Sequence, residues 1–260
     1  MKYLTTFASA AVMALTVAAV SAPAHAAVVA QFTPDTNASD YRWINSGPGN
    51  NGTGGHFFTI TGNTQTAAHG VNTHFSFLDP ALSALAFIPA TFTVDATVAS
   101  GNAASKNAAG VWSQRGLSGS FSFVYTGATV NNFHGSGINL IHNSNLLSGI
   151  FTDAWIQGAG GSGSANVAVQ NGGNANFTSA YRSFTNSAGD PEEFAFNLLA
   201  ASPNFGANAG KALKTFRANG GGNFSASDVP EPATWGLMLV GFGGLGLMMR
   251  NNRRLALAKI

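Results

Sequence analysis

The stretch ATFTVDATVAS (residues 90–100) alternates apolar and polar residues over most of its length. The apolar positions, two residues apart, are Phe92, Val94, Ala96 and Val98. Successive side chains of an extended strand point to opposite faces, so the alternation predicts a strand with one face in a core and one in water. Asp95 falls on the polar side, which predicts a surface position for this carboxylate.

The same two-residue period recurs through the middle of the chain. It is seen in HFFTITG (56–62), THFSFLD (73–79), GSFSFVYTG (119–127), SANVAVQNG (164–172), NANFTSAYRSF (174–184), EEFAFNLLA (192–200) and KTFRANGGGNFSAS (214–227). Clusters of Gly and Asn separate these stretches and are typical of turns. Many short strands with turns between them predict an all-β domain, an antiparallel β-sandwich or jelly roll. DPALSALAF (79–87) predicts one helical turn or a short helix before a strand.

The first 26 residues have the pattern of a secretory signal peptide. Lys2 precedes an apolar stretch of small residues, and SAPAHA (21–26) follows it. A short basic start, an apolar segment and an A-x-A site are the three parts of such a signal. We expect signal peptidase to act at Ala24, Ala26 and Ala27, with cleavage after Ala26. The alternative is a membrane anchor that is retained.

The other end of the chain contains a second apolar segment. Residues 233–249 carry no charge, and as a helix they would be about 25 Å long, slightly short of a membrane core. Arg250, Arg253 and Arg254 follow and favour a cytoplasmic end. Pro230 and Pro232 keep the preceding backbone extended. The pattern predicts a transmembrane helix that holds the exported chain at the inner membrane.

Pro230, Glu231, Pro232 and Trp235, followed by the apolar segment and the arginines, resemble the PEP-CTERM sorting signal of Gram-negative bacteria. The variant with tryptophan three residues after the second proline is the most similar. Gly236 follows the tryptophan where alanine is common in that variant. The resemblance covers about the last 30 residues. It implies processing by an exosortase, a membrane-embedded enzyme, and a source that makes exopolysaccharide.

These signals divide the chain into a signal peptide (1–26), an exported domain (27–228) and a sorting segment (229–260). The exported domain has seven Lys or Arg residues and nine Asp or Glu residues, a net charge of about −2. It therefore offers no extended basic surface for nucleic acid. The chain has no cysteine, which excludes disulfides and thiol catalysis.

No catalytic or metal-binding residue can be assigned from the pattern. His56, His69 and His74 lack a metal-ligand spacing and are better explained as surface residues. Glu192 and Glu193 are adjacent, so on a strand they point to opposite faces. A structural calcium ion is the one cofactor left open, with candidate ligands Asp35, Asp40, Asp79, Asp153 and Asp190.

Aromatic residues are the candidates for contact with sugar. Tyr41, Trp43 and Trp155 are chosen for stacking on glycan rings, and Trp112, Tyr125 and Tyr181 are further aromatic residues of the domain. Packing in the core is the alternative, and for any one of these residues it is the more common role.

The sequence as a whole favours a non-enzymatic protein of the cell surface or extracellular matrix, with a structural or interaction role in exopolysaccharide or biofilm. The expected partners are signal peptidase, an exosortase, the inner membrane during export, and exopolysaccharide. A lectin-like carbohydrate-binding module is the first alternative, and a glycan-active hydrolase is the second.

Overall fold

The structure is a computed structural model that describes residues 27–35, 39–62, 64–169, 173–184 and 192–226. Within these residues no helix has the length and apolar character needed to cross a membrane. The predicted signal peptide and the predicted sorting segment, with its transmembrane helix, lie outside the described residues.

The described chain consists of strands joined by turns, as the alternating pattern predicts. The strands are β1 (Ala27–Pro34), β2 (Tyr41–Asn45), β3 (Gly55–Thr59), β4 (Val71–Phe77), β5 (Ile88–Val98), β6 (Ser105–Lys106), β7 (Val111–Tyr125), β8 (Asn145–Ala159), β9 (Ala165–Ala168), β10 (Asn174–Thr178), β11 (Glu193–Ser202) and β12 (Phe216–Ala226). Single 3-10 turns are η1 (Pro48–Asn50), η2 (Pro80–Leu82) and η3 (Phe133–Gly135). The all-β prediction is confirmed, and the helical turn expected in residues 79–87 is η2.

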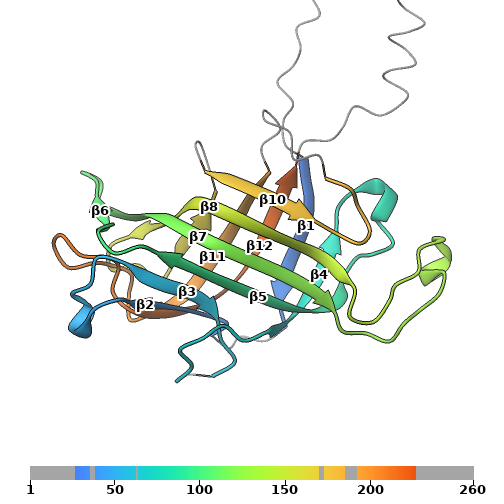
Figure 1. Ribbon diagram of the computed structural model, residues 1–260, viewed down its shortest axis with the longest axis horizontal. Helices are drawn as coiled ribbons and strands as arrows, with labels where there is room; N and C mark the ends of the chain where they lie inside the picture. Colours follow the sequence, from blue (N-terminus) through green and yellow to red (C-terminus); the bar gives the residue numbers. More distant parts are fainter. Residues whose placement is uncertain (1–26, 36–38, 63, 170–172, 185–191, 227–260) are drawn as a thin grey trace, which may run out of the picture.

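All twelve strands form one antiparallel sheet, ordered β1-β4-β5-β3-β2-β12-β11-β9-β8-β7-β6 with β10 beside β8. Two additional pairings, β1 with β12 and β5 with β7, close the sheet on itself. Figure 1 shows β5, β7 and β8 in one layer, with β11 and β12 crossing behind them.

The prediction of a sandwich of two sheets therefore needs correction. The long strand β5 pairs with β7 on one edge, and with β4 and then β3 on the other. In the same way β12 pairs with β11 on one edge, and with β2 and then β1 on the other. Because these two strands bridge the layers, hydrogen bonding continues around the molecule where a sandwich would have open edges.

The core is dominated by phenylalanine. Phe32 contacts Phe92, Phe123, Phe196 and Phe224, with ring centroids 4.8–6.1 Å apart. Phe92 stacks on Phe123 at 4.4 Å, and both side chains are fully buried. These rings come from five strands, so the inward positions of the alternating pattern meet in one cluster. Aromatic contacts of this kind stabilise a fold beyond the burial of their area.

Glycine makes room for these rings at one position of the sheet. A Cβ atom on Gly149 would lie 2.8 Å from Cε1 of Phe121, closer than real side chains approach. Gly149 pairs with Phe121 on one side and with Phe177 on the other. Its lack of a side chain lets the two phenylalanines pack across β8.

The alternation fails at β3, where Phe57, Phe58 and Thr59 are all buried. Phe58 pairs with Arg42 on the outer face of the sheet. The Arg42 guanidinium donates a hydrogen bond to the Gln65 carbonyl, and the His69 N–H bonds to the Thr59 carbonyl. These contacts fix the segment after β3 beside this part of the sheet, which explains an apolar residue on a face expected to be in water.

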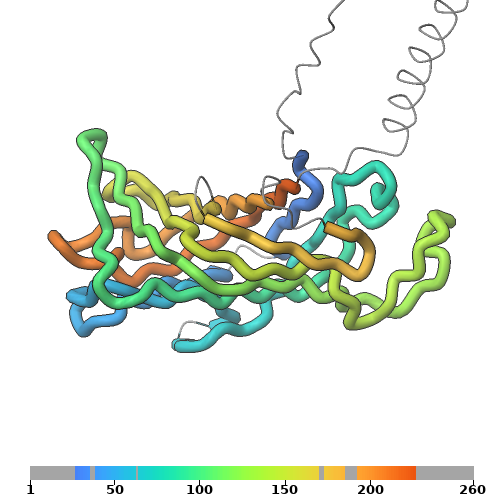
Figure 2. The backbone as a smooth tube through the Cα atoms, turned by 45° about the horizontal axis from the view of Figure 1, so that its top comes forward, coloured from blue at the N-terminus to red at the C-terminus, as the bar shows by residue number. Residues whose placement is uncertain are grey.

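The first and last described strands end together. Ala27 pairs with Ala226, so both ends of the described chain lie at one edge of the domain. Figure 2 shows the blue and red ends side by side. The segment predicted to anchor the protein therefore leaves the domain next to its first residues.

We expect Phe123→Ala to destabilise the domain by about 3–5 kcal/mol, because it opens a cavity among the clustered rings. Urea unfolding of residues 27–228 measures the change. Phe87→Ala is the matched control, since Phe87 is 67% exposed, and it should lower the free energy of unfolding much less. Equal effects of the two substitutions would contradict the central role of the cluster.

Candidate functional site

Two of the three predicted glycan-stacking residues belong to the core. Tyr41 and Trp43 are fully buried. Tyr41 stacks on Phe57 at 5.6 Å, and Nε1 of Trp43 donates a hydrogen bond to the Leu213 carbonyl at 2.9 Å. The prediction that these residues contact glycan is wrong, because alternation on β2 directs both side chains into the closed sheet.

Trp155 remains available for such a contact. It lies on β8 between the buried residues Ala154 and Ile156, so its half-buried side chain is on the outer face. The pairing of β8 with β7 is irregular just before it, where Asp153 has a positive φ of 55°. Its role in binding glycan stays a prediction.

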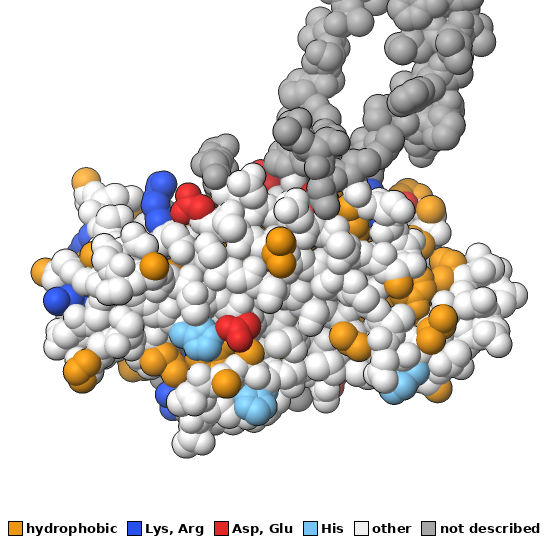
Figure 3. All heavy atoms as spheres, viewed as in Figure 1, with side chains coloured by type: hydrophobic (Ala, Val, Ile, Leu, Met, Phe, Trp, Pro, Cys, Tyr) orange, Lys and Arg blue, Asp and Glu red, His pale blue; other side chains and the backbone are white. Residues whose placement is uncertain are grey.

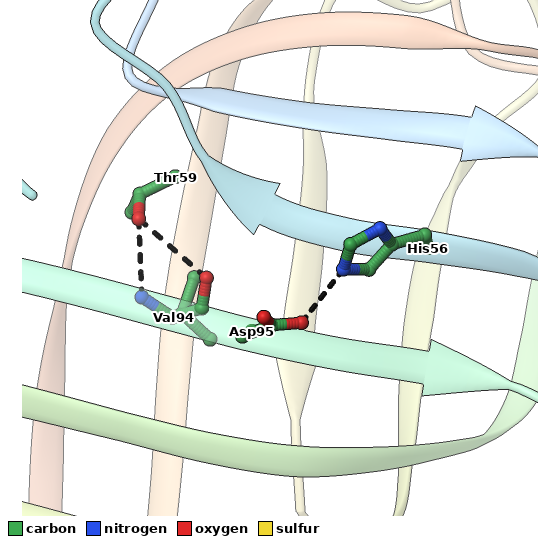
Figure 4. Close-up of polar contacts among 4 residues, drawn as sticks. All are labelled: His56, Thr59, Val94 and Asp95. Atoms are coloured by element: carbon green, nitrogen blue, oxygen red, sulfur yellow. Dashed lines mark hydrogen bonds and ion pairs between the residues drawn. The ribbon is translucent and has the colours of Figure 1, made fainter. Parts of the chain in front are cut away.

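Asp95 lies on the surface, as the alternating pattern predicts. Its carboxylate is 2.6 Å from Nε2 of His56 on the neighbouring strand β3, and Figure 4 shows this contact. Three residues further along β3, the Thr59 hydroxyl accepts a hydrogen bond from the Val94 N–H at 3.2 Å. Two contacts therefore link β3 to β5. Asp95 of β5 pairs with the side chain of His56 on β3, and the hydroxyl of Thr59 on β3 bonds to the backbone of β5.

Glu192 and Glu193 differ in environment, as expected for adjacent residues. Glu192 is buried, and its Oε2 accepts a hydrogen bond from the Phe177 N–H of β10. Burial raises the pKa of its carboxyl to about 7, against the opposing effect of that hydrogen bond. Glu193 is only partly buried. The Glu192 side chain therefore contacts β10 where this strand runs beside β11.

Asp40 is a second buried carboxyl. Its Oδ2 atom has no hydrogen-bond partner among the described residues, and burial raises its pKa to about 6. It lies directly before β2, beside the core residue Tyr41. A buried group of this kind favours the neutral form, since a charge there is poorly solvated.

The other candidate metal ligands make separate contacts. Nδ1 of His74 is 3.5 Å from Asp35, and its ring stacks on Phe87 at 4.0 Å. Asp79 forms an ion pair with Arg182. In the described part of the chain no three His, Asp or Glu residues form a group suited to a metal ion. Asp190 lies outside the described residues, and calcium binding stays a prediction.

A pocket of about 490 Å³ lies at the end of the domain that carries β6. Trp112 of β7 forms part of its wall, with Lys106 of β6 and Lys214 beside it. The lining also includes Ala109, Gly110, Ala159, Gly160, Gly161, Asn204, Phe205, Gly206 and Ala207. None of these residues is acidic.

Backbone hydrogen bonds hold the segments of this pocket together. The Gly160 N–H donates to the Gly110 carbonyl at 3.1 Å, and the Gly161 N–H to the Phe205 carbonyl at 2.9 Å. The Lys214 N–H donates to the Gly206 carbonyl at 2.8 Å. Three loops far apart in the sequence are therefore fixed around one indole ring.

The polar groups of the pocket are available to a ligand. The Lys106 ammonium lies 5.6 Å from the centroid of the Trp112 ring. Neither Lys106 nor Lys214 forms an ion pair within the described residues, and Nε1 of Trp112 has no hydrogen-bond partner there. Pattern reasoning noted Trp112 as an aromatic residue but did not select it, because nothing in the sequence brings Lys214 close to it.

The fold and the chain ends define a class of protein, an all-β domain whose last strand leads directly into a C-terminal segment. The comparison with known families identifies that segment, since residues 228–254 match the PEP-CTERM protein-sorting motif. The chain carries this sorting signal, which marks an exported protein that is held transiently at a membrane and processed by an exosortase. No curated protein and no solved structure matches the chain.

The predicted sorting residues Pro230, Glu231, Pro232 and Trp235 fall within the matched range. Their positions in space, and those of Arg250, Arg253 and Arg254, lie outside the described residues. The same holds for Ala24 and Ala26 of the predicted signal peptidase site, whereas Ala27 is the first residue of β1.

The raised pKa of Glu192 predicts that the domain loses stability as the pH rises. The folded state holds this proton up to about pH 7, whereas the ordinary carboxyl value is 4.5. Between these values the folded state binds more protons than the unfolded state. The free energy of unfolding should therefore fall by up to about 1.4 kcal/mol per pH unit from this group.

Urea unfolding at pH 5 and pH 8 checks this expectation. Glu192→Gln should stabilise the domain at pH 8 and change it little at pH 5, because it removes the cost of the buried charge. Glu193→Gln is the control and should keep the wild-type dependence. An unchanged pH profile in Glu192→Gln would show that Glu192 is not its source.

Proposed function

We propose that this protein is a non-enzymatic component of the cell surface or extracellular matrix, where its β domain has a structural or interaction role within exopolysaccharide or biofilm. The sorting motif at residues 228–254 is the observation that carries the proposal. Release of the domain by an exosortase would place it among secreted polymers in a bacterium that makes exopolysaccharide.

The position of the motif supports processing close to the folded domain. β12 ends at Ala226, and Pro230 follows four residues later. Four extended residues span at most about 14 Å. Before processing, the domain would therefore lie directly outside the membrane.

The surface also suits contact with hydrated polymers. On β7, β8 and β10 the exposed charged residues are Arg115 and Asp153. The other polar residues of the outer face are uncharged, and they include Ser118, Ser120, Ser122, Ser148, Thr152, Asn174, Asn176 and Thr178. Figure 3 shows this face as a largely uncharged surface with scattered apolar side chains. Hydroxyl and amide groups both donate and accept hydrogen bonds, as sugar hydroxyls do.

A carbohydrate-binding module is the alternative that a specific observation favours, namely the pocket around Trp112. A glycan-active hydrolase has less support. It would need two carboxyl groups flanking the bond to be broken. The Trp112 pocket and two further depressions on the described surface have no Asp or Glu in their lining.

We expect Glu231→Ala to leave an unprocessed form in the inner membrane while the domain still folds outside. The reason is that Glu231 lies between two prolines in the matched motif, where an extended backbone would present it to the processing enzyme. Fractionation of the native host with an antibody to the domain measures this. Normal processing and release of the variant would show that the motif does not direct sorting here.

The role in the matrix has its own test. In the native host, the processed protein should be recovered with the isolated exopolysaccharide, and removal of the polymer by mutation of its synthesis should release the protein into the medium. A protein of the same size that lacks this domain, fused to the same sorting segment, is the control. Equal release of both proteins in the presence of the polymer would contradict the proposed role.

A further inference from the structure

We propose that the pocket around Trp112 binds an acidic sugar of a polysaccharide, with the indole as the stacking surface and Lys106 and Lys214 as partners of the sugar carboxylate. The inference rests on the proposed function and names a ligand class and a site for it. It is drawn from the shape, the charge and the position of the pocket.

The first argument is charge. Lys106 and Lys214 come from separate segments, and both are exposed without an ion-pair partner among the described residues. Although the exported domain as a whole is slightly acidic, the two lysines make this end a local positive region that attracts an anion. Figure 3 shows most visible Lys and Arg side chains toward the end that carries β6.

Acidic residues are distant along the strands that lead into the pocket. On β8, Asp153 is six residues before Ala159, which corresponds to about 20 Å of strand. Asp95 pairs with Ser120, eight residues along β7 from Trp112, or about 26 Å. The lysines therefore keep their charge available for a ligand.

The second argument is the setting of the indole. Trp112 is half-buried, which fixes the ring and leaves part of it open. A Cβ atom on Gly160 would lie 3.2 Å from Nε1 of Trp112, and one on Gly206 would lie 3.9 Å from it. Glycine at these positions keeps the space beside the N–H free. An aromatic ring offers a sugar its apolar face, while the N–H can bond to a hydroxyl or carboxylate.

The lysine and the indole can act on the same sugar ring. Because the Lys106 ammonium lies over the Trp112 ring, 5.6 Å from its centroid, a carboxylate that it binds would lie close to the indole. Lys214 lines the same pocket from the segment that leads into β12. The volume of about 490 Å³ falls within the usual range of small-molecule sites.

The third argument is position. Lys214 lies two residues before β12, and Ala226 is the last residue of this strand. Its eleven residues span about 36 Å, so the pocket and the exit of the sorting segment are separated by about the length of this strand. A domain held at the membrane by its tail would keep this pocket away from the point of attachment.

The geometry favours an acidic polysaccharide over nucleic acid. Binding of a nucleic acid relies on basic side chains along an extended backbone and on several stacking rings. Here two lysines and one indole converge on a single pocket. That arrangement fits one charged sugar residue in a chain.

The experiment uses the exported protein purified from the native host and isothermal titration with a galacturonate hexamer, with a neutral glucose hexamer and a single-stranded DNA hexamer as comparison probes. We expect galacturonate to bind at least tenfold more tightly than glucose, with affinity that falls as salt rises. Trp112→Ala should weaken binding at least tenfold. Lys106→Gln combined with Lys214→Gln should weaken it similarly and reduce the salt dependence.

Two variants serve as matched controls. Phe87→Ala removes an exposed aromatic ring outside the pocket, and Lys211→Gln removes a lysine that does not line it. Both should bind galacturonate within twofold of wild type. Thermal unfolding of every variant checks that the domain is folded, and Trp112→Phe, which keeps a ring in place, should retain more affinity than Trp112→Ala.

Several results would overturn the assignment. They are the absence of galacturonate binding, equal binding of the glucose hexamer, or tighter binding of DNA. Loss of affinity in the control variants without a loss in the pocket variants would overturn it as well. If the wild type fails to bind galacturonate but stays with the exopolysaccharide of the host, the site is wrong and the proposed function stands. If it also separates from the exopolysaccharide, the proposed function fails as well.

Discussion

The pairing of β1 with β12 is the constraint on which the rest of the structure depends. It joins the first described strand to the last, with Ala27 opposite Ala226, and completes the hydrogen bonding around the sheet. A closed sheet leaves fewer strand edges exposed and holds its inward side chains on a common axis. Closure also brings Phe32 of β1 into contact with rings from β5, β7, β11 and β12. The chain has no disulfide, so this closure and the packing it permits hold the domain together.

Closure also separates two functions in space. One end of the domain collects both chain ends and leads into the sorting motif. The loops before β7, after β8 and before β12 surround Trp112 in another part of the domain. Because β12 lies between them, attachment and the proposed contact with polymer do not compete for one surface. The rigid sheet fixes the distance between the two ends, while the loops at the pocket are free to differ in sequence.

The positions of the aromatic residues show what the alternating pattern predicts about the fold and what it does not. Alternation placed Phe92, Val94, Ala96 and Val98 on one face, and all four side chains are buried, because a period of two residues determines a face. It did not determine which face of β2 is inside, so glycan stacking and core packing both stayed open for Tyr41 and Trp43, which lie in the core. Asp95 was placed correctly by the same rule. The pairing of the strands could not be predicted from the sequence. Neither the closure of the sheet nor the bridging by β5 and β12 depends on a pattern within a single stretch.

By itself the sequence determined the all-β character of the domain and the sorting signal at its end. Both are local properties: strand alternation is read within a few residues, and the sorting motif is a continuous stretch recognised as such. Only the tertiary structure decided that the sheet is closed, that Glu192 is buried beside β10, and that Lys106, Trp112 and Lys214 share a pocket. The closure and the pocket bring together residues far apart in the chain, such as Ala27 with Ala226 and Trp112 with Lys214, and such contacts follow from strand pairing and packing of the whole core. The sorting signal is therefore encoded in one continuous stretch of sequence, whereas the candidate binding site is formed only in the folded domain.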